Sequence, residues 1–290
     1  MHILVYYDKI ALVMNMIINE SPYADVIKID PELGFSVVHK LDKNPSTRIY
    51  MLHNHDDIYE IVLLLGGDCE FEVEGNTYKI KPNDIVFTRP FEFHHIVCRT
   101  DKPYDRVILY ITADYFKMHG LEKYLGIFEN RQLGTGNIVS SDLTGGAERD
   151  CMLRILRYFS ENAYDVAKGL IIEFLYLLNK TKRVSDDFFT RNERIRDIIV
   201  YINSNLAEEL RLDDISKKFF MDKHYLCKSF KKNTGYTVNQ YINYKRILLA
   251  QELHRSGQTL LQASMNAGFN SYAHFYKTYV KQTGKSPRSM

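Results

Sequence analysis

The spacing of hydrophobic residues changes along this chain of 290 residues, and each spacing predicts a different kind of element. From about 35 to 112, apolar and polar residues alternate, which is typical of β-strands with one buried face and one wet face. The segment 69–74 alternates in this way, and Gly75-Asn76 then predicts a hairpin turn. Because the short strands follow one another without intervening helices, we expect a β-barrel or jelly roll.

Residues from about 147 to 180 return to the helical spacing of three and four. The second half of this stretch has a strongly apolar face, made of Leu170, Ile171, Phe174, Leu175 and Leu178. Such a face can form a seam between two subunits, or it can simply cover the barrel. We expect a homodimer in which residues 1–181 are sufficient for assembly.

Two further segments are less informative. Residues 10–18 are compatible with a short amphipathic helix, to which the pattern assigns no role, and the interruption by Asn15 argues against a signal peptide or a membrane anchor. Residues 182–190 are predicted to be a linker. Thr190-x-x-Glu193 is a capping box, which predicts that the next helix starts there.

The segment 212–284 contains one pattern twice, with one extra residue after Asn270 in the second copy. Each copy predicts a short helix, a tight turn and a second helix, which is the helix-turn-helix order. Asp222 and Asn270 are predicted to be the N-caps of the second helices. The inward stripes of these helices are Leu226 with Phe230 and Phe275 with Tyr279.

The opposite faces of the two second helices carry cations and hydrogen-bonding groups. A helix of this kind can enter the major groove of DNA, whereas the simpler alternative is a helical bundle with solvated lysines. Thr237-x-x-Gln240 starts the helix that connects the two copies, and Gly257 stops it after about Ser256. About 19 residues give a length of roughly 28 Å, close to the roughly 34 Å between successive major-groove faces.

Residues from about 195 to 287 resemble the AraC/XylS-type DNA-binding domain, which joins two helix-turn-helix units through a long helix. The matching residues are Leu226, Phe230-Lys231-Lys232, Gly235, Tyr241-Ile242, Arg246, Ala250, Gly268-Phe269, Phe275, Gly284 and Pro287. The chain departs from the pattern at Ser216, Phe220, Ala263, Ser264 and Tyr279. The resemblance implies that the DNA-binding residues are His224, Cys227, Lys228, Lys231, Lys232, Tyr272, Ala273, Tyr276, Lys277 and Lys281.

The distribution of charge agrees with a polyanionic partner. The chain as a whole has a formal charge of +2, but the part from Arg191 onward has 17 Lys and Arg against 8 Asp and Glu, a net of +9. The basic part is the one with the two helix-turn-helix patterns, as DNA binding requires. The four cysteines are widely separated and fit no metal or redox spacing, so we expect reduced thiols of a cytoplasmic protein.

A second resemblance concerns the part with strand spacing. The order His53-x-His55, Glu60, Gly67, Pro82-Asn83-Asp84, Pro90 and His95 is similar to the cupin-type ligand-binding domain of many AraC-type regulators. Three imidazoles and one carboxylate suit a borderline divalent ion. Sensory cupins often keep part of this pattern without a metal, however, so we expect a barrel without a tightly held metal and with an organic effector in its mouth. The candidate effector-binding residues are His53, His55, Tyr59, Glu60, Arg89 and His95.

The expected fold class is α+β, with several domains. A cupin-like effector-binding domain (1–140) precedes a helical segment for dimerisation or covering (141–181), the linker (182–190) and the DNA-binding domain (191–290). The resemblances imply a sequence-specific transcription regulator that binds double-stranded DNA, a carbohydrate-like effector and RNA polymerase, without a catalytic residue or a cofactor. The alternative is a metal-dependent cupin enzyme, in which the C-terminal domain serves only to target the enzyme to DNA. Such an enzyme would need a stoichiometric metal whose removal abolishes an activity.

Overall fold

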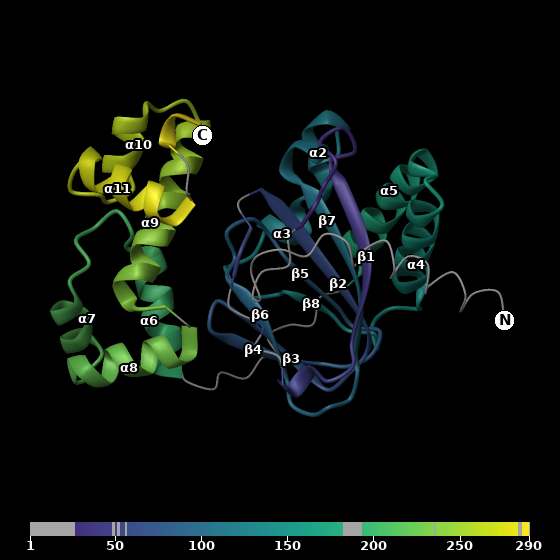
Figure 1. Ribbon diagram of the computed structural model, residues 1–290, viewed down its shortest axis with the longest axis horizontal. Helices are drawn as coiled ribbons and strands as arrows, with labels where there is room; N and C mark the ends of the chain where they lie inside the picture. Colours follow the sequence, from purple (N-terminus) through teal and green to yellow (C-terminus); the bar gives the residue numbers. More distant parts are fainter. Residues whose placement is uncertain are drawn as a thin grey trace.

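The computed structural model describes residues 27–47, 50, 53–55, 57–181, 193–234, 236–283 and 286–289 (Figure 1). The possible helix at 10–18, the predicted linker at 182–190 and the capping residue Thr190 lie outside these residues. Among the described residues, no helix combines the length and the apolar character needed to cross a membrane.

The N-terminal part is built on two antiparallel sheets. One has five strands in the order β1-β7-β2-β5-β8, and the other has three in the order β4-β3-β6. The strands are β1 (Phe35–Asp42), β2 (Ile58–Gly66), β3 (Cys69–Val73), β4 (Asn76–Ile80), β5 (Ile85–Thr88), β6 (His94–Cys98), β7 (Tyr104–Thr112) and β8 (Ile138–Val139). The helices of this part are η1 (Pro45–Thr47), α2 (Ala113–Met118), η2 (Glu122–Tyr124), α3 (Gly126–Glu129), α4 (Ala147–Ser160) and α5 (Tyr164–Lys180).

The five-stranded sheet is buried on both faces. One face packs against the three-stranded sheet, through residues such as Val62 and Phe71, and the other is covered by α2 to α5, through residues such as Ile61 and Phe174. Because neighbouring residues of a strand point to opposite faces, β2 contributes side chains to both cores, which explains its continuous apolar run. Figure 1 shows α4 and α5 on one side of the sheets and the C-terminal helices on the other.

The apolar face of α5 is fully used inside the chain. All five residues that we expected at a subunit seam, Leu170, Ile171, Phe174, Leu175 and Leu178, are buried in the core that the five-stranded sheet shares with the helices, and α5 packs on α4, α3 and η2. The predicted seam is therefore wrong, and the covering role is the one that the structure shows. The face is broad because α5 packs on several neighbours at once.

The hairpin between β3 and β4 turns one residue earlier than predicted. Val73 pairs with Asn76, so the loop is Glu74-Gly75 and Asn76 already belongs to β4. Both loop residues have positive φ, 47° and 83°, as a type I′ turn requires. Glycine accepts this geometry easily and glutamate does not, so the Glu74 side chain must find compensating contacts.

The C-terminal part is all helical. Its helices are α6 (Glu193–Ser204), α7 (Leu212–Lys218), α8 (Lys223–Thr234), α9 (Val238–Arg255), α10 (Leu260–Asn266), α11 (Tyr272–Thr283) and η3 (Pro287–Ser289). The Thr237/Gln240 capping box starts α9 as predicted, and the helix ends before Gly257. Its 18 residues give a length of about 27 Å.

The two helix-turn-helix units differ at their turns. Asp222 caps α8 as predicted, since its carboxylate accepts a hydrogen bond from the Tyr225 amide at 2.9 Å. Ser271, not Asn270, accepts the corresponding bond at α11, because the extra residue moves the cap one position along the chain. Phe220 and Gly268 occupy equivalent positions in the two turns, and both have positive φ. A Cβ at Gly268 would lie only 2.1 Å from the Leu206 carbonyl oxygen, whereas the Phe220 side chain points into solvent and is 94% exposed. Hence only the second unit needs glycine here.

Candidate DNA interface and effector site

The helices α8 and α11 each bury one stripe and expose the opposite face. Leu226 and Phe230 of α8 are buried, as are Phe275 and Tyr279 of α11. Of the ten predicted DNA-binding residues, eight are exposed, namely His224, Lys228, Lys231, Lys232, Ala273, Tyr276, Lys277 and Lys281, and Cys227 and Tyr272 are partly buried. Both recognition faces therefore stay accessible while the two domains contact each other.

The positions of three further side chains bear on the predicted interface. Lys232 lies beside a cavity of about 390 Å³ between the two domains, which also involves Glu72 and His95. Tyr225 and His274 are exposed near the N-termini of α8 and α11, and the sequence analysis did not single them out. Their place near the start of each second helix could have identified them, because the N-terminal residues of a recognition helix commonly contact bases.

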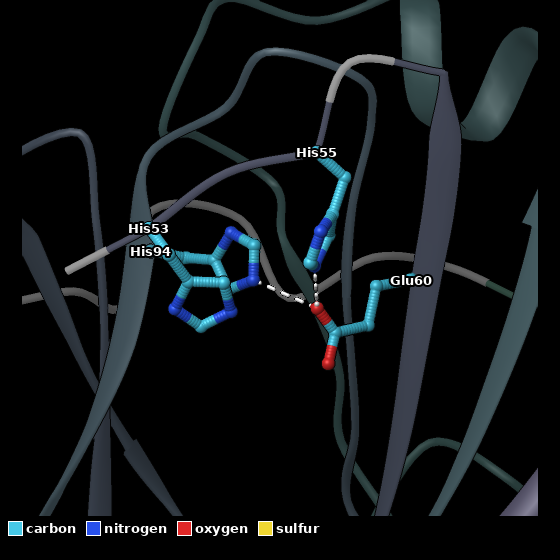
Figure 2. A group of neighbouring side chains, drawn as sticks. All are labelled: His53, His55, Glu60 and His94. Carbon is cyan, nitrogen blue, oxygen red and sulfur yellow. Dashed lines mark hydrogen bonds and ion pairs between the residues drawn. The ribbon is translucent and has the colours of Figure 1, made fainter. Parts of the chain in front are cut away.

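The N-terminal domain contains a compact polar cluster between its two sheets. His53, His55, Glu60 and His94 each offer a ligand atom, and these atoms all lie within 4.8 Å of one another. The Nε2 atoms of His55 and His94 lie 2.9 and 2.8 Å from the same Glu60 oxygen, Oε2 (Figure 2). Glu60 and His94 are buried and His53 is exposed, so the cluster reaches the surface at one end.

The cluster contains His94 in place of the predicted His95. Adjacent residues of β6 point to opposite faces of the sheet, and only His94 faces Glu60. His95 faces the DNA-binding domain and lies 3.2 Å from Glu72. The spacing of the sequence motif identified the strand correctly and missed the residue by one position.

Tyr59 and Arg89 do not join the cluster either. Tyr59 lies on the opposite face of β2 from Glu60, in the core beneath the helices, and its hydroxyl donates to Glu129 at 2.9 Å. The Arg89 guanidinium contacts the same carboxylate at 3.0 Å. The two residues therefore tie α3 to the sheet, and neither lies with the histidine cluster, contrary to the arrangement we expected.

The charges of the cluster are strongly coupled. Burial alone would raise the pKa of Glu60, but the positive charge of His94 and hydrogen bonds from His55 and His94 hold it well below its usual value. Burial would likewise lower the pKa of His94, but the charge of Glu60 and its hydrogen bond raise it. The two shifts have opposite signs and a common cause, so the pairing favours an ionised Glu60 beside a protonated His94 over two neutral groups.

A buried ion pair supports the segment that precedes β6. Glu92 is completely buried, and the Arg131 guanidinium donates to both of its carboxylate oxygens at 2.6 Å. The Gly134 amide and the Asn137 side chain donate to the same carboxylate. Burial would raise the pKa of Glu92, but the charge and hydrogen bonds of Arg131 outweigh it and lower the pKa.

A second buried carboxylate joins the two domains. Glu74, in the strained hairpin turn, accepts hydrogen bonds from Lys245 at 2.5 Å, from Tyr241 at 2.7 Å and from Asn203 at 3.2 Å. It also accepts one from the Phe93 amide at 2.8 Å. Glu74 and Lys245 are only 3% and 4% exposed, so these contacts hold Glu74 in its unfavourable backbone conformation and fix α6 and α9 against the sheet.

Aromatic contacts surround this ion pair. The Phe93 ring belongs to the core of the first helix-turn-helix unit and lies 5.0–5.5 Å, between ring centroids, from Tyr236, Tyr241 and Tyr244. The Tyr244 hydroxyl donates to Asn54 at 3.0 Å. No signal in the sequence marked Glu74 or Phe93, because their partners lie more than a hundred residues away.

The cysteines are not all isolated. Cys69 and Cys98 are directly opposite each other on β3 and β6, with their sulfur atoms 2.9 Å apart. Both are free thiols, as are Cys151 and Cys227. The expectation of reduced thiols is therefore compatible with the structure. The wide separation in the sequence did not indicate that the sheet brings together two cysteines 29 positions apart.

Two family models match the chain. The AraC-like ligand-binding domain matches residues 41–123 and a helix-turn-helix domain matches residues 215–290, together more than half of the chain. The transcriptional regulator YdiP of Escherichia coli K12 is 23% identical over 248 residues, which cover 81% of this chain and 78% of that protein. The transcriptional activator RhaS of Citrobacter koseri is 25% identical over 247 residues, covering 82% and 86%.

Solved structures give similar matches. ToxT of Vibrio cholerae O395 covers 88% of this chain and 96% of its own, at 17% identity and a TM-score of 0.38. The DNA-binding domain of AdpA, solved with a target DNA, covers 33% of this chain and 87% of its own, at 21% identity and a TM-score of 0.32. With its AraC-like ligand-binding domain followed by a helix-turn-helix domain, this chain belongs to the AraC family of transcription regulators.

Proposed function

We propose that this regulator recognises specific DNA sequences through the exposed faces of α8 and α11. The observation that carries the proposal is that α8 and α11 each bury one stripe of residues and therefore expose the opposite face to solvent. The two helices are joined through α9, which is about 27 Å long. That length approaches the roughly 34 Å between major-groove faces on one side of the duplex, so one subunit can place its two recognition helices in successive segments of the groove.

The N-terminal domain, in this proposal, binds an effector between its two sheets and has no catalytic role. The histidine cluster supplies the polar groups that would hold the effector, and a carbohydrate-like molecule is the class that the family resemblance suggests. The regulator would act in the cytoplasm, where RNA polymerase is its natural partner at a promoter. The second candidate function is a cupin enzyme, and the histidine cluster is the only feature that favours it. Turnover of a substrate would be needed to support this alternative.

Lys277→Ala and Lys281→Ala should weaken DNA binding in different ways. Lys277 lies where it can donate to guanine O6 and N7, so its loss should cost about 1–3 kcal/mol on the preferred site and flatten the preference at one or two positions. Lys281 lies one turn further on, where a cation contacts phosphates. Its loss should therefore weaken binding to all DNA sequences alike, and should lower by about one the slope of log affinity against log salt concentration.

Binding-site selection with both variants at two salt concentrations distinguishes these effects. Lys168→Ala, on α5 of the N-terminal domain, is the control and should leave affinity and motif unchanged. Equal losses for Lys277→Ala and Lys281→Ala, with an unchanged motif, would show that the recognition face is assigned wrongly.

We also propose a homodimer, with the contact moved to the outer face of α5. Val166, Ile172 and Tyr176 of this helix remain 41–45% exposed, although its inner face is buried. Ile172→Glu in the full chain should shift the sedimentation coefficient from that of a dimer to that of a monomer at tens of micromolar, because a charge at an apolar contact must be desolvated. Leu143→Glu, an equally exposed site outside α5, should leave the dimer intact. A monomeric wild type would contradict this proposal.

A further inference from the structure

We propose that Cys69 and Cys98 form a redox-sensitive modification site, at which a hydroperoxide converts the two thiols into a reversible disulfide between β3 and β6. These two strands lead directly into the segments that contact the DNA-binding domain. The formation of the disulfide goes beyond the proposed function, and only its regulatory role rests on that function.

The position of the pair in the sheet suits a disulfide. Cys69 and Cys98 are register partners on β3 and β6. Hydrogen-bonded and non-hydrogen-bonded pairs alternate along an antiparallel ladder. The neighbouring pair is joined by a hydrogen bond of 3.0 Å from the Arg99 amide to the Asp68 carbonyl, so the cysteines form a non-hydrogen-bonded pair. The Cα atoms of such a pair are about 4.5 Å apart, within the range of about 4.4–6.8 Å that disulfides span.

The two sulfur atoms are close to bonding distance. They lie 2.9 Å apart, and because a disulfide bond is about 2.05 Å long, a shift of less than about 1 Å closes it. The Cα separation of this kind of pair is shorter than the most common value of about 5.5–6 Å, so the bond is strained and is readily reduced again. Strained disulfides are typically the labile and regulatory ones, and the disulfides of cytoplasmic proteins are usually transient.

The surroundings favour Cys98 as the sulfur that attacks the peroxide. Cys98 is partly exposed, whereas Cys69 is buried. A hydrogen bond from the Cys69 thiol lowers the pKa of Cys98, and the charge of the buried Arg106 lowers it further against the opposing effect of burial. Asp42, which lies 2.8 Å from Arg106, offsets part of that charge without reversing the shift. An accessible thiolate beside a second cysteine is the arrangement in which cysteines are oxidised selectively.

The reaction takes two steps. The Cys98 thiolate attacks one oxygen of the hydroperoxide, so that an S–O bond forms, the O–O bond breaks, and the leaving oxygen takes up the proton that Cys98 lost. The Cys69 sulfur then attacks the sulfenic sulfur of Cys98; the S–S bond forms, the S–O bond breaks, and the hydroxyl leaves as water with the Cys69 proton. Two thiols are thereby oxidised by two electrons, and the peroxide is reduced by the same two.

The disulfide would close one end of a ladder whose other end holds the DNA-binding domain. Glu74 follows β3 directly and pairs with Lys245 of α9. Phe93 precedes β6 directly and packs against Tyr241 of the same helix. A backbone hydrogen bond of 2.9 Å from the Glu74 amide to the Phe93 carbonyl joins the two segments. A covalent bond between β3 and β6 opposes opening of this ladder, so it should hold the contacts with α9 more firmly.

Formation of the disulfide is tested with hydrogen peroxide on the full chain, after reduction with dithiothreitol and desalting. Wild type should lose two of its four thiols. Peptide mapping without reductant should then find a link between Cys69 and Cys98, which dithiothreitol reverses. In Cys69→Ser, Cys98 should stop at the sulfenic acid and be captured by dimedone, because the second sulfur is missing.

Cys151→Ala is the matched control for this experiment. Burial raises the pKa of the Cys151 thiol to about 11, so this cysteine should stay unreactive and its loss should leave the link unchanged. A wild type in which dimedone captures Cys98 and no link forms would overturn the site. Failure of both Cys69 and Cys98 to react, or a link through another cysteine, would overturn it equally.

The effect on docking is tested by hydrogen exchange of the reduced and the oxidised protein. Oxidation of wild type should slow exchange in β3, in β6 and at Glu74 by at least about tenfold, a modest part of what a disulfide typically contributes. It should also slow exchange in α9, and neither effect should occur in Cys69→Ser. Slower exchange only beside the cysteines, with Glu74 and α9 unchanged, would overturn the effect on docking.

These outcomes are distinct from failure of the proposed function. Selection of a DNA motif by a protein whose Cys69 and Cys98 never become linked would remove only the redox inference. A reversible link with slower exchange in α9, in a protein that selects no DNA motif, would remove the proposed function and leave the modification site.

Discussion

Arg131→Met is expected to lower the free energy of unfolding of the N-terminal domain by about 3–5 kcal/mol, the usual cost of breaking a buried ion pair from one side. Arg131 is the cation beside Glu92, and the two side chains are 3% and 0% exposed. Without the guanidinium, the carboxylate keeps the Gly134 and Asn137 hydrogen bonds but has no charge partner. Urea denaturation at neutral pH measures the loss.

Two comparisons test the cause. Arg149→Met removes an exposed pair with Asp150 and should have no measurable effect. The double variant Arg131→Met/Glu92→Leu should be more stable than Arg131→Met alone, because it removes the unpaired charge as well. A double variant that is less stable than the single one would show that packing, not charge, dominates at this site.

The same pair predicts how stability depends on pH. The pKa of Glu92 is lowered in the folded protein. The contribution of Glu92 to the free energy of unfolding is therefore present above the pKa of the unfolded chain, about 4.3, and is lost as the pH falls through the lower pKa of the folded state. In Arg131→Met the two largest causes of the lowering are gone, and burial then raises the pKa of Glu92 against the remaining effects of the Gly134 amide and the Arg89 charge. The difference in stability between wild type and variant should therefore be largest at neutral pH and shrink as the pH approaches about 4. A difference that is constant across this range would contradict the assignment.

Lys245→Met should detach the two domains rather than unfold either one. The Glu74 carboxylate would then lie buried between the domains with only neutral hydrogen-bond donors, and opening the interface is the simplest way to hydrate it. We expect a loss of docking free energy of about 3–5 kcal/mol. It should appear as faster hydrogen exchange at Phe93 and in α6 and as a larger radius of gyration in solution scattering.

Lys232→Met is the matched control for this prediction. Lys232 lines the cavity between the same two domains but is itself exposed, so its loss should change neither measurement. Unchanged exchange at Phe93 in Lys245→Met would mean that aromatic packing alone holds the domains together.

The sequence predicted the elements whose signals are local. The repeat at 212–284, the Thr237/Gln240 capping box and the period of two in the sheets each depend on residues close together in the chain, and the structure confirms them. The errors of one position have a common cause. Each of them depends on strand register or on cap geometry, which a shift of one residue alters completely. We predicted His95 where the cluster contains His94, a turn at Gly75-Asn76 where it lies at Glu74-Gly75, and a cap at Asn270 where Ser271 is the cap.

The larger errors concern contacts between distant segments. Nothing near Tyr59 or Arg89 indicates that both meet Glu129, and nothing near Glu74 indicates a partner 171 positions away. The apolar face of α5 shows that it is buried but not by what, and so the seam was predicted where the sheet already packs. Composition and periodicity determine which face is buried; only the three-dimensional arrangement determines its neighbour.

The central claim is that one subunit places two recognition helices in successive major-groove segments. Hydroxyl-radical footprinting of the full chain on a selected site tests it most directly. The account predicts two protected tracts per subunit, about 10 base pairs apart on one side of the duplex. Protection should be lost from one tract in Lys228→Ala and from the other in Lys277→Ala. A single tract per subunit, weakened equally by both substitutions, would contradict the account.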